Sequence, residues 1–497
     1  MNKRFRFVIV FFLVVLAMRL LFAFSTPSFS DDESYFSLRQ VEHITETGLP
    51  LYDDPLSYGG KQHAFSPLFY YLLAFFNLFL PITIIAKLIP NMLAASVMIF
   101  TYLISLELTK NQKVALFTSM VSPFVPVFFA STINSVTPFT LVLPLVLAII
   151  YCFMRSEDKR FVTAYMILLL ALSITHVSVF VLMMGFIVFL LLLKLEKLKQ
   201  SVSELEIGIF SVFFVFWSQF IIFKQAILEL GPRILVQNIP VDVTMDYMRS
   251  VSPLDIINQV GILTIFFGVY IIYKYLFIEK KRDMYLIFSF LLIVFLLIYL
   301  RLVLLEEGLI LAGILLVILF SQYLKLLLLF IQKSKFGRFE NYFLGGLALL
   351  FLLTSVVPSI YYAEQDISKS FNQTELEAVR WIKENTDPGS TILSSYREGS
   401  FISYHAQRKN VVDSNFLLVD DIHERFEDVR NIYTTQLATT AIELLNKYDV
   451  DYIYVSPENR EHFGIEKLAY VEDTSCFRPV YEDDGVKVIR TTCRLTT

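Results

Sequence analysis

The chain has 497 residues, of which 56% are hydrophobic and only 18% are charged. Soluble domains are closer to one quarter charged, so this composition excludes an ordinary soluble enzyme and a disordered protein. Three cysteines are too few for a disulfide framework, and a net charge of −4 gives no reason to expect nucleic-acid binding. Acidic residues outnumber basic ones after residue 372, whereas the preceding part is apolar and slightly basic. We therefore expect a membrane part followed by an acidic domain.

The membrane part is predicted from runs of apolar residues. A helix needs roughly 20 such residues to cross the hydrocarbon core. Eleven segments are candidates: 5–24, 84–107, 113–130, 137–154, 161–175, 177–193, 207–223, 258–278, 284–300, 307–327 and 342–361. The segment 66–80 is apolar but shorter, and it contains or adjoins Pro67 and Pro81, so we interpret it as interfacial or re-entrant. The predicted fold class is a polytopic α-helical membrane protein of about 11 spans with a C-terminal extracytoplasmic α/β domain.

The basic residues predict the orientation of these spans. Lys and Arg collect in cytoplasmic loops. With a cytoplasmic N-terminus, nineteen basic residues of the membrane part fall in inside loops and eight in outer loops or spans. Residues 1–24 lack a small-residue cleavage site of a signal peptide, so we interpret them as a retained first helix. The prediction is a multi-pass protein of the cell membrane with an extracytoplasmic C-terminal domain.

The domain boundaries follow from this pattern. We expect a transmembrane domain at 1–361 with outer loops 25–83 and 224–257, a linker at 362–371, and an α/β domain at 372–497. In the first loop, a helix is expected at 33–47, before a turn at Gly48-Leu49-Pro50. The C-terminal domain is predicted to contain helices at 375–384, 421–433 and 440–448 and strands at 391–394, 410–413, 451–455, 478–481 and 486–490. Cys476 and Cys493 could form a disulfide if they lie outside.

Three acids directly follow the first span: Asp31, Asp32 and Glu33. A carboxylate held at the bilayer surface could act as general base for an acceptor hydroxyl or amide. It could also bind a divalent ion such as Mg²⁺ or Mn²⁺ through oxygen. The alternative is a helix cap by Asp31 or Asp32, with acids in the first turn favoured by the helix dipole. The two interpretations are compatible.

The motifs of the first loop resemble those of a known family. The run Asp32-Glu33-Ser34-Tyr35-Phe36, then Gly48-Leu49-Pro50, then Ser66-Pro67-Leu68-Phe69-Tyr70-Tyr71-Leu72, resembles the first outer loop of GT-C superfamily glycosyltransferases. It is most similar to the protein O-mannosyltransferase and lipid A aminoarabinose transferase branch, and its layout is distantly similar to the oligosaccharyltransferase catalytic subunit. The resemblance covers roughly the first 160 residues in detail, and the rest only in layout.

The resemblance implies an inverting glycosyltransferase. Its donor would be a sugar linked to a polyprenyl phosphate, and its acceptor a glycan, protein or lipid on the outer face of the membrane. Asp32 would correspond to the catalytic Asp and Glu33 to its partner, with Asp31 beside them. Membrane lipids are the remaining expected partners, and no nucleic acid is expected.

Two departures from the oligosaccharyltransferase pattern stand out, and the first of them favours a metal-independent mechanism. Oligosaccharyltransferases carry an acidic motif in the next outer loop, whereas 130–137 here contains no acid. The C-terminal domain also lacks their Trp-Trp-Asp motif, and its Trp is Trp381. A Ser-Val-Ser-Glu string at 201–204 mimics one of their motifs, but we interpret it as the start of the following helix. We therefore expect no metal and a C-terminal domain without catalytic residues.

A phosphate leaving group requires cationic partners. The candidates for contact with the lipid phosphate or sugar are Arg301, Arg233, His176, Lys61, His63 and Arg19. Arg301 follows a span at the outer face, where a guanidinium can bind a phosphate in a bidentate manner or pair with Glu306. Arg19 lies within the first span, where a charged residue usually has a partner. A lone His such as His176 is more often structural.

Three other functions are to be weighed for a polytopic chain. The first is a transporter or flippase of lipid-linked glycans, although such proteins place charges at the membrane midplane and use repeats that this sequence lacks. The second is a metal-dependent transferase of the oligosaccharyltransferase type. A surface anchor is a third class, but two long outer loops exceed what an anchor requires. The sequence does not specify the sugar, the acceptor or the oligomeric state.

Overall fold

The computed structural model describes residues 3–241, 243, 251–335, 337–472 and 475–494. The chain divides into two compact units. The helical unit comprises residues 1–26, 65–224 and 245–368, and the second unit comprises 27–64, 225–244 and 369–497. This division differs from the predicted boundaries, because most of the first outer loop and part of 224–257 group with the C-terminal domain. Some of that second loop lies outside the described residues.

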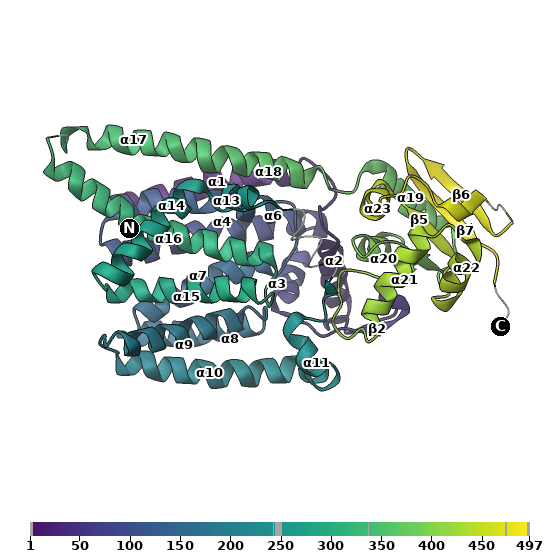
Figure 1. Cartoon of the computed structure of the whole chain (residues 1–497), viewed down its shortest axis with the longest axis horizontal. Helices are drawn as coiled ribbons and strands as arrows, with labels where there is room; N and C mark the ends of the chain where they lie inside the picture. The colour runs from purple at the N-terminus through teal and green to yellow at the C-terminus, as the bar shows by residue number, and fades with distance from the viewer. Residues whose placement is uncertain (1–2, 242, 244–250, 336, 473–474, 495–497) are drawn as a thin grey trace. The chain divides into compact units, whose positions relative to one another are not determined.

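The helical unit consists of a bundle and short connecting helices. Its α-helices are α1 (Lys3–Ala23), α3 (Leu68–Asn77), α4 (Ile82–Thr109), α5 (Gln112–Val121), α6 (Pro126–Ser131), α7 (Phe139–Met154), α8 (Lys159–Ser173), α9 (Val179–Leu195), α10 (Val202–Ile222), α13 (Pro253–Val260), α14 (Ile262–Tyr273), α15 (Arg282–Tyr299), α16 (Leu305–Lys333), α17 (Glu340–Phe351) and α18 (Val357–Ile367). Figure 1 shows α7, α8, α9, α10 and α15 running alongside one another. The long apolar helices of this bundle make the chain a multi-pass membrane protein.

Six helices of the described residues are long and apolar enough to cross a membrane, or seven if the bent pair α13 and α14 is one span. This number is smaller than the predicted eleven. The segment 113–130 breaks at Pro123 and Pro126 into α5, a 3-10 turn and α6. The segment 258–278 bends by 85° between α13 and α14, where Gly261 has φ +103°. Hydropathy alone cannot reveal such breaks, because the residues on both sides stay apolar.

Three other predicted spans form short helices. α7, α8 and α9 contain 16, 15 and 17 residues. At 1.5 Å per residue they are about 23–26 Å long, somewhat below a full hydrocarbon core. The apolar segment 66–80 contains only the ten-residue helix α3, in keeping with its interpretation as interfacial or re-entrant.

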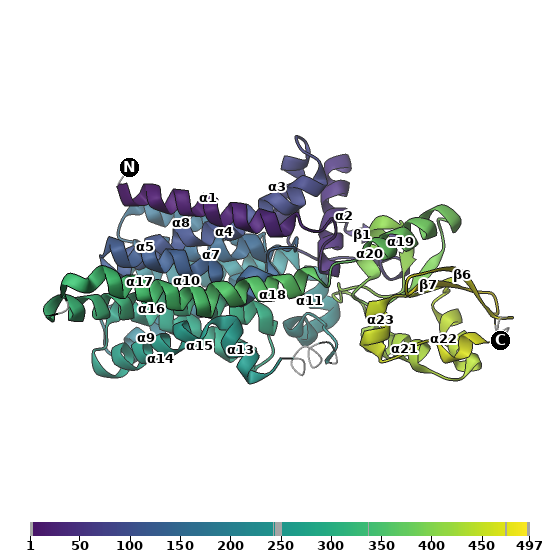
Figure 2. The ribbon, with the colours of Figure 1, turned by 90° about the horizontal axis from the view of Figure 1, so that it is seen from above.

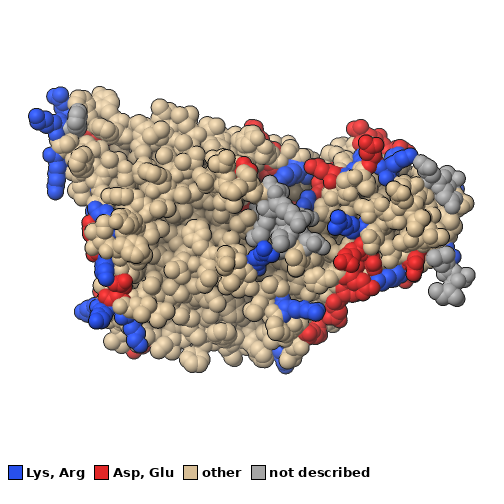
Figure 3. All heavy atoms as spheres, viewed as in Figure 1, with Lys and Arg blue, Asp and Glu red and all other residues tan. Residues whose placement is uncertain are grey.

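The surface of the helical unit has the character expected of a membrane protein. Large apolar side chains are exposed along its helices, among them Leu21, Phe213, Trp217 and Phe330, which are 77%, 73%, 63% and 74% exposed. On the face shown in Figure 3, charged side chains gather at the ends of the unit and leave its flank uncharged. The basic residues at the start of α8 and α15 and the end of α9 and α16 belong to loops predicted inside. Ser201 caps α10 in a capping box with Glu204, as expected for 201–204.

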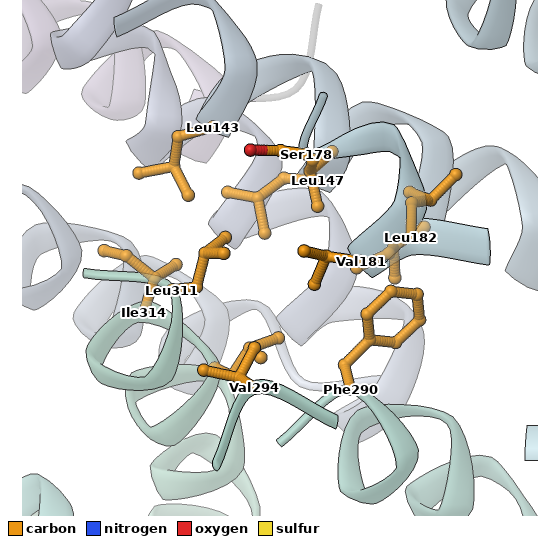
Figure 4. A pocket seen from close by; sticks show the side chains of 12 residues that line it. Leu143, Leu147, Ser178, Val181, Leu182, Phe290, Val294, Leu311 and Ile314 are labelled. Carbon is orange, nitrogen blue, oxygen red and sulfur yellow. The ribbon is translucent and has the colours of Figure 1, made fainter. Parts of the chain in front are cut away.

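The bundle leaves one small apolar cavity between α7, α9, α15 and α16 (Figure 4). Leu143, Leu147, Val181, Phe290 and Leu311 are among the side chains that line it. Its volume of about 10 Å³ is at the lower limit for a single water molecule. This cavity is a packing defect rather than a sugar site.

The second unit is an α/β domain built on a five-stranded mixed sheet. Its strand order is β4-β3-β5-β7-β6, with β4, β3 and β5 parallel and β7 and β6 antiparallel. The strands are β3 (Thr391–Leu393), β4 (Lys409–Asn410), β5 (Tyr452–Val455), β6 (Phe477–Asp483) and β7 (Val486–Thr491). The helices are α19 (Gln373–Asn385), α20 (Gly399–His405), α21 (Ile422–Thr434), α22 (Ala438–Lys447) and α23 (Pro457–Phe463). Figure 2 shows α19 and α20 on one face of the sheet and α21, α22 and α23 on the other.

Most of these elements match the prediction for 372–497, but α20 and α23 were not predicted. Both contain only seven residues, too few to show a clear apolar period. A disulfide joins Cys476 and Cys493, which flank the β6–β7 hairpin. The residues of the first loop add α2 (Asp32–Thr47), the short strands β1 (Asp53–Asp54) and β2 (Lys61–Gln62), and a 3-10 turn at Ser57–Gly59. α11 (Lys224–Leu230) and a 3-10 helix at Gly231–Val236 precede the segment 237–244.

Candidate active site

The helix α2 begins at the acidic cluster and gives each acid a different role. Asp31 is the N-cap, and its Oδ1 accepts a hydrogen bond from the backbone N–H of Ser34 at 2.7 Å. Asp32 is the first helical residue and is buried, whereas Glu33 is exposed. The three carboxylates do not converge because successive residues at a helix start point in different directions. The helix ends at Gly48, whose φ of +80° suits the left-handed C-cap.

Asp32 is bound by residues that follow the parallel strands of the sheet. Its Oδ1 accepts hydrogen bonds from the backbone N–H of Ser400 at 2.7 Å and of Phe401 at 3.1 Å. Its Oδ2 accepts from the hydroxyl of Ser414 at 2.8 Å and from the Ser414 N–H at 3.2 Å. Residues almost 400 positions apart in the chain therefore form one polar cluster inside the α/β unit.

Gly399 makes this arrangement possible. A Cβ atom at this position would lie 2.0 Å from the carbonyl oxygen of Val412 and 2.7 Å from the Cβ of Asp413. The backbone at the start of α20 can therefore approach the residues after β4 only if residue 399 has no side chain. This close approach brings the N–H groups of Ser400 and Phe401 to the same carboxylate as Ser414.

A second buried acid, Asp413, lies beside this cluster. Its carboxylate accepts hydrogen bonds from Ser57 Oγ at 2.6 Å, from Asn410 Nδ2 at 3.1 Å and from the Asn415 N–H at 3.0 Å. Burial and the neighbouring Asp413 carboxylate raise the pKa of Asp32 to about 7. A carboxylate with a pKa near neutrality is suited to general base catalysis at physiological pH.

Tyr58 connects the first loop to this acid. Its hydroxyl donates to the Asp413 carbonyl at 2.7 Å, and its backbone N–H donates to Asn410 Oδ1 at 2.8 Å. Tyr58 has φ +52°, a left-handed conformation that is unfavourable for a residue with a bulky side chain. The surrounding hydrogen bonds hold this strained turn in place, as is common at ligand and catalytic sites.

Lys61 and His63 lie close to this cluster, as part of the same loop. Lys61 donates to the carbonyl of Asn415, and its ammonium lies 4.4 Å from the centre of the Tyr58 ring. Burial lowers the pKa of Lys61 to about 8. His63 is buried, with Nε2 3.5 Å from Asp54 Oδ2. Asp54 in turn forms a bidentate ion pair with Arg39, with both distances 2.7 Å.

The remaining predicted residues of this unit and the loops do not form part of the cluster. Arg233 is exposed in the 3-10 helix at Gly231–Val236. In the helical unit, Arg301 is exposed after α15 with φ +58°. His176 is half-buried between α8 and α9, and its Nδ1 lies 2.7 Å from Ser178 Oγ. The structure thus brings Lys61 and His63 near the acidic cluster. Arg233 belongs to the same unit but is exposed and is not one of the residues of the cluster.

Arg19 belongs to a separate polar cluster inside the helical unit. It is completely buried in α1, with Nε donating to Asn91 Oδ1 at 2.9 Å and Nη2 to Thr132 Oγ1 at 2.7 Å. Its guanidinium carbon lies 5.2 Å from the centre of the Phe129 ring. The buried Nη1 atom has no hydrogen-bond partner among the described residues. Arg19 forms no ion pair in the described part of the chain.

Sequence reasoning overlooked Lys87, which is 4% exposed in α4 of the same unit. Its ammonium donates to the carbonyls of Ala23 and Thr26 at the end of α1, and it lies 3.4 Å from Asn134 Oδ1. A basic residue within the apolar run 84–107 was the available signal, because intramembrane charges are costly and usually functional. Asp413 and Ser414 gave no comparable signal, since they fall in an ordinary acidic domain.

The acids do not fit a divalent-ion site. Asp31 caps α2, both Asp32 oxygens accept two hydrogen bonds each, and Glu33 is exposed. A divalent ion needs six or more oxygen ligands, several of them carboxylates that point inward. Among the described residues, no group of three or more His, Cys, Asp or Glu side chains is arranged to hold a metal.

No protein-family model matches the sequence, and none of the curated proteins matches it. Similarity to solved structures is clear in the fold. The chain is similar to the oligosaccharyltransferase AglB from Archaeoglobus fulgidus in complex with an inhibitory peptide and a dolichol-phosphate, with a TM-score of 0.63 and 14% identity over 89% of this chain and 69% of that one. It is also similar to an Archaeoglobus fulgidus oligosaccharyltransferase tethered to an acceptor peptide containing the NVT sequon, with a TM-score of 0.63 and 13% identity over 97% of this chain and 74% of that one.

A third similar structure is ArnT from Cupriavidus metallidurans bound to undecaprenyl phosphate. Its TM-score is 0.53 and its identity 11%, over 97% of both chains. At identities this low the similarity concerns the fold alone. The expected resemblance to GT-C enzymes, including the aminoarabinose transferase and oligosaccharyltransferase branches, is thereby confirmed at the level of structure.

Proposed function

We propose that the chain is an inverting glycosyltransferase that moves a sugar from a polyprenyl-phosphate-linked donor to an acceptor on the outer face of the membrane. One observation carries the proposal: in a chain with a GT-C fold, the acid matching the family's catalytic Asp is buried and has a pKa of about 7. Solved structures of this fold hold dolichol-phosphate or undecaprenyl phosphate, which supports the class of donor.

Asp32 is proposed as the general base. It would remove a proton from the acceptor hydroxyl or amide as the acceptor attacks the anomeric carbon and the bond to the lipid phosphate breaks. This single displacement inverts the anomeric centre and needs no glycosyl-enzyme intermediate. Asp31 would position α2 through its cap. The family pattern assigns Glu33 as the partner of Asp32. Glu33 is exposed, so it would contribute from a different face of the start of α2 than Asp32 does.

Each of the predicted cations is proposed, one by one, as a candidate contact for the charged end of the donor. Arg301 is exposed next to α16 and can present its fork of N–H donors to a phosphate. Arg19 has a buried Nη1 atom that finds no hydrogen-bond partner within the described part of the chain. Lys61 and His63 lie on the first loop, and burial lowers the pKa of both side chains, so a bound anion would favour the protonated form of each. His176 and Arg233 complete the proposed set.

The reaction is tested with purified protein in nanodiscs. The donors are undecaprenyl-phosphate and dolichol-phosphate carriers, each charged with a radiolabelled hexose or aminosugar, and the readout is released polyprenyl phosphate. A transferase releases polyprenyl phosphate from at least one carrier, together with a labelled product. A flippase instead moves the intact donor across a liposome membrane without cleaving it, and that result would contradict the proposal.

The same assay distinguishes the two branches of the fold. Because the acids do not converge, we expect turnover to persist in excess EDTA. Loss of turnover in EDTA with recovery on addition of Mg²⁺ or Mn²⁺ would instead favour a metal-dependent oligosaccharyltransferase type. The higher TM-scores to AglB make this comparison worthwhile.

The proposed orientation is tested by labelling with a membrane-impermeant thiol reagent. Leu49 and Leu437 are 66% and 64% exposed, so Leu49→Cys and Leu437→Cys should react from outside intact cells. Lys335→Cys, at an exposed position of a loop predicted inside, should react only after permeabilisation. Cys152→Ser provides the background, since Cys152 is the free cysteine of the chain. The Cys476–Cys493 disulfide supports an oxidising compartment for this domain.

A further inference from the structure

The hydrogen bonds to Asp32 use its whole accepting capacity. An ionised carboxylate offers about four lone-pair positions, two on each oxygen. Oδ1 accepts from Ser400 and Phe401, and Oδ2 accepts from both the N–H and the hydroxyl of Ser414. While all four bonds are present, a proton from an acceptor substrate has no lone pair to which it can transfer. A base in this setting must first lose one donor.

Only one of the four donors can leave without moving the backbone. Three are main-chain N–H groups, fixed by the start of α20 and by the turn after β4. The fourth is the hydroxyl of Ser414, which can rotate about its Cα–Cβ bond. Ser414 is half-buried, whereas Asp32 is 5% exposed. The hydroxyl is therefore the movable donor, and it belongs to the more exposed residue of the pair.

We propose that Ser414, in the C-terminal domain, is a positioning residue for Asp32, whose hydroxyl holds the carboxylate in its fully bonded arrangement and turns away to admit the proton of the acceptor. The inference rests on the proposed function and assigns a catalytic contribution to a domain that was expected to have none. It also gives Asp413 a role, because this second buried carboxylate opposes the ionisation of Asp32.

The proposed step transfers one proton to Asp32 and one sugar to the acceptor. The Ser414 hydroxyl rotates away and frees one lone pair of Asp32 Oδ2. The acceptor O–H or N–H transfers its proton to that lone pair while its oxygen or nitrogen forms a bond to the anomeric carbon. The bond between this carbon and the phosphate oxygen breaks, and its electron pair leaves with the polyprenyl phosphate. The carboxylic acid then releases its proton to water, and Ser414 restores the original bond.

Several ionisable groups set the charge balance around Asp32. Its own helix start carries Asp31, Glu33 and Tyr35. Tyr58 and Asp413 act on it from the elements packed around it, and Lys61 and Arg425 in turn act on Asp413 or Tyr58. Burial and Asp413 raise the pKa of Asp32, and the hydrogen bond from Ser414 lowers it. The two neighbours therefore act in opposite directions on one group.

This opposition supplies the test. The pH dependence of kcat/KM is measured for wild type, Ser414→Ala, Ser414→Thr and Asp413→Asn. Because the base must be ionised, activity rises with pH through the pKa of Asp32. Ser414→Ala removes a donor to the carboxylate, so we expect the acidic limb to move up by about one pH unit. Ser414→Thr keeps the hydroxyl and should retain the wild-type limb. Asp413→Asn should move the limb to lower pH.

A structural role for Ser414 makes a different prediction. It would lower Tm in Ser414→Ala without moving the acidic limb, and that result with normal wild-type turnover would overturn this proposal alone. Absence of polyprenyl-phosphate release from wild type on every carrier would overturn the proposed function instead. A second measurement follows the ionisation of Asp32 without using turnover. It compares the Tm of the protein with and without Asp32→Asn across pH, once with Ser414 present and once with Ser414→Ala. An unchanged midpoint in that series would also contradict the proposal.

Discussion

The helical unit and the α/β unit each bind a buried ion with neutral groups, and the α/β unit also binds a buried ion with a counter-charge. In the helical unit, Arg19 is bound by an amide and a hydroxyl, and in the α/β unit Asp32 is bound by N–H and O–H donors. Asp54 is also buried in the α/β unit, but it has Arg39 as a direct counter-charge. A counter-charge serves stability, because removal of either partner leaves an unpaired ion. A buried ion with only neutral partners adds less to the stability of the fold. Its presence therefore favours a role of the charge in binding or catalysis.

The largest expected effect comes from breaking the counter-charged pair. Arg39→Met leaves Asp54 buried without its bidentate partner, and His63 at 3.5 Å compensates only in part. We expect the free energy of unfolding of the α/β unit to fall by about 3–5 kcal/mol, as for other broken buried pairs. Thermal unfolding followed by the near-UV signal of this unit measures the loss. The double variant Arg39→Met with Asp54→Leu should recover part of it, and failure to recover would contradict the pair as the cause.

The second variant removes the charge of Asp32 but retains its shape. Asp32→Asn cannot accept a proton, so we expect turnover to fall by roughly two or more orders of magnitude. Its amide nitrogen would also face N–H donors, which lowers the stability of the unit. Asp31→Asn is the matched control, because Asn caps a helix as well as Asp does and should retain most of the activity. Equal, mild losses in both variants would leave Asp32 a structural role only.

The third variant tests whether the charge of Arg19 is needed for folding. Arg19→Met removes a buried ion that has no counter-charge among the described residues. Asn91 Oδ1 and Thr132 Oγ1 each lose a donor, although the Thr132 hydroxyl still donates to the carbonyl of Phe128. Replacing such an ion with an apolar side chain is often nearly neutral for stability. We therefore expect a change of at most about 1 kcal/mol in unfolding, together with roughly a tenfold higher KM for the lipid donor.

The opposite outcome for Arg19 is equally informative. A large drop in Tm with an unchanged donor KM would assign Arg19 to helix packing and remove it from the proposed site. Arg301→Ala provides the comparison, because Arg301 is exposed and its loss should raise the donor KM without a change in Tm.

The sequence predicted the parts of the molecule that depend on local patterns. The helix α2, its end at Gly48, and the Asp-Gly turn between β6 and β7 follow from residue types at fixed spacings. The acids of the first loop and the GT-C resemblance were visible in short motifs, and the structural similarity confirms the resemblance. The role of each acid, by contrast, was left open between cap and site.

The partners of those acids could not be predicted. Asp32 is bound by Ser400, Phe401 and Ser414, more than 360 residues away, and nothing in their local sequence marks them. Their position depends on the parallel register of β3 and β4 and on the close approach at Gly399. The overestimate of the number of spans has a related cause. Proline and glycine break apolar helices at positions set by packing, as at Gly261, so a hydropathy count joins segments that the fold separates.

The smallest effect, and the most specific, is the pH dependence of stability that comes from two of the buried carboxylates, Asp54 and Asp32. Burial would raise the pKa of Asp54, but His63 and Arg39 hold it well below the usual range. Its contribution is therefore present above the unfolded pKa, near 4, and is lost as the pH falls below it. The pKa of Asp32 is raised to about 7, so its contribution has the opposite sign. It is present below pH 4 and is lost as the pH rises from about 4 through 7.

Thermal unfolding from pH 3 to 8 should separate these contributions. Asp32→Asn should flatten the fall in Tm between about pH 4 and 7, because Asn does not ionise. Asp54→Asn should flatten the fall on the acidic side and leave the neutral range unchanged. The disulfide between Cys476 and Cys493 stays intact throughout, so reduction does not mix into either slope. If Asp32→Asn left the neutral range as steep as in wild type, Asp32 would titrate below neutrality, and both its proposed basicity and the influence of Asp413 would be contradicted.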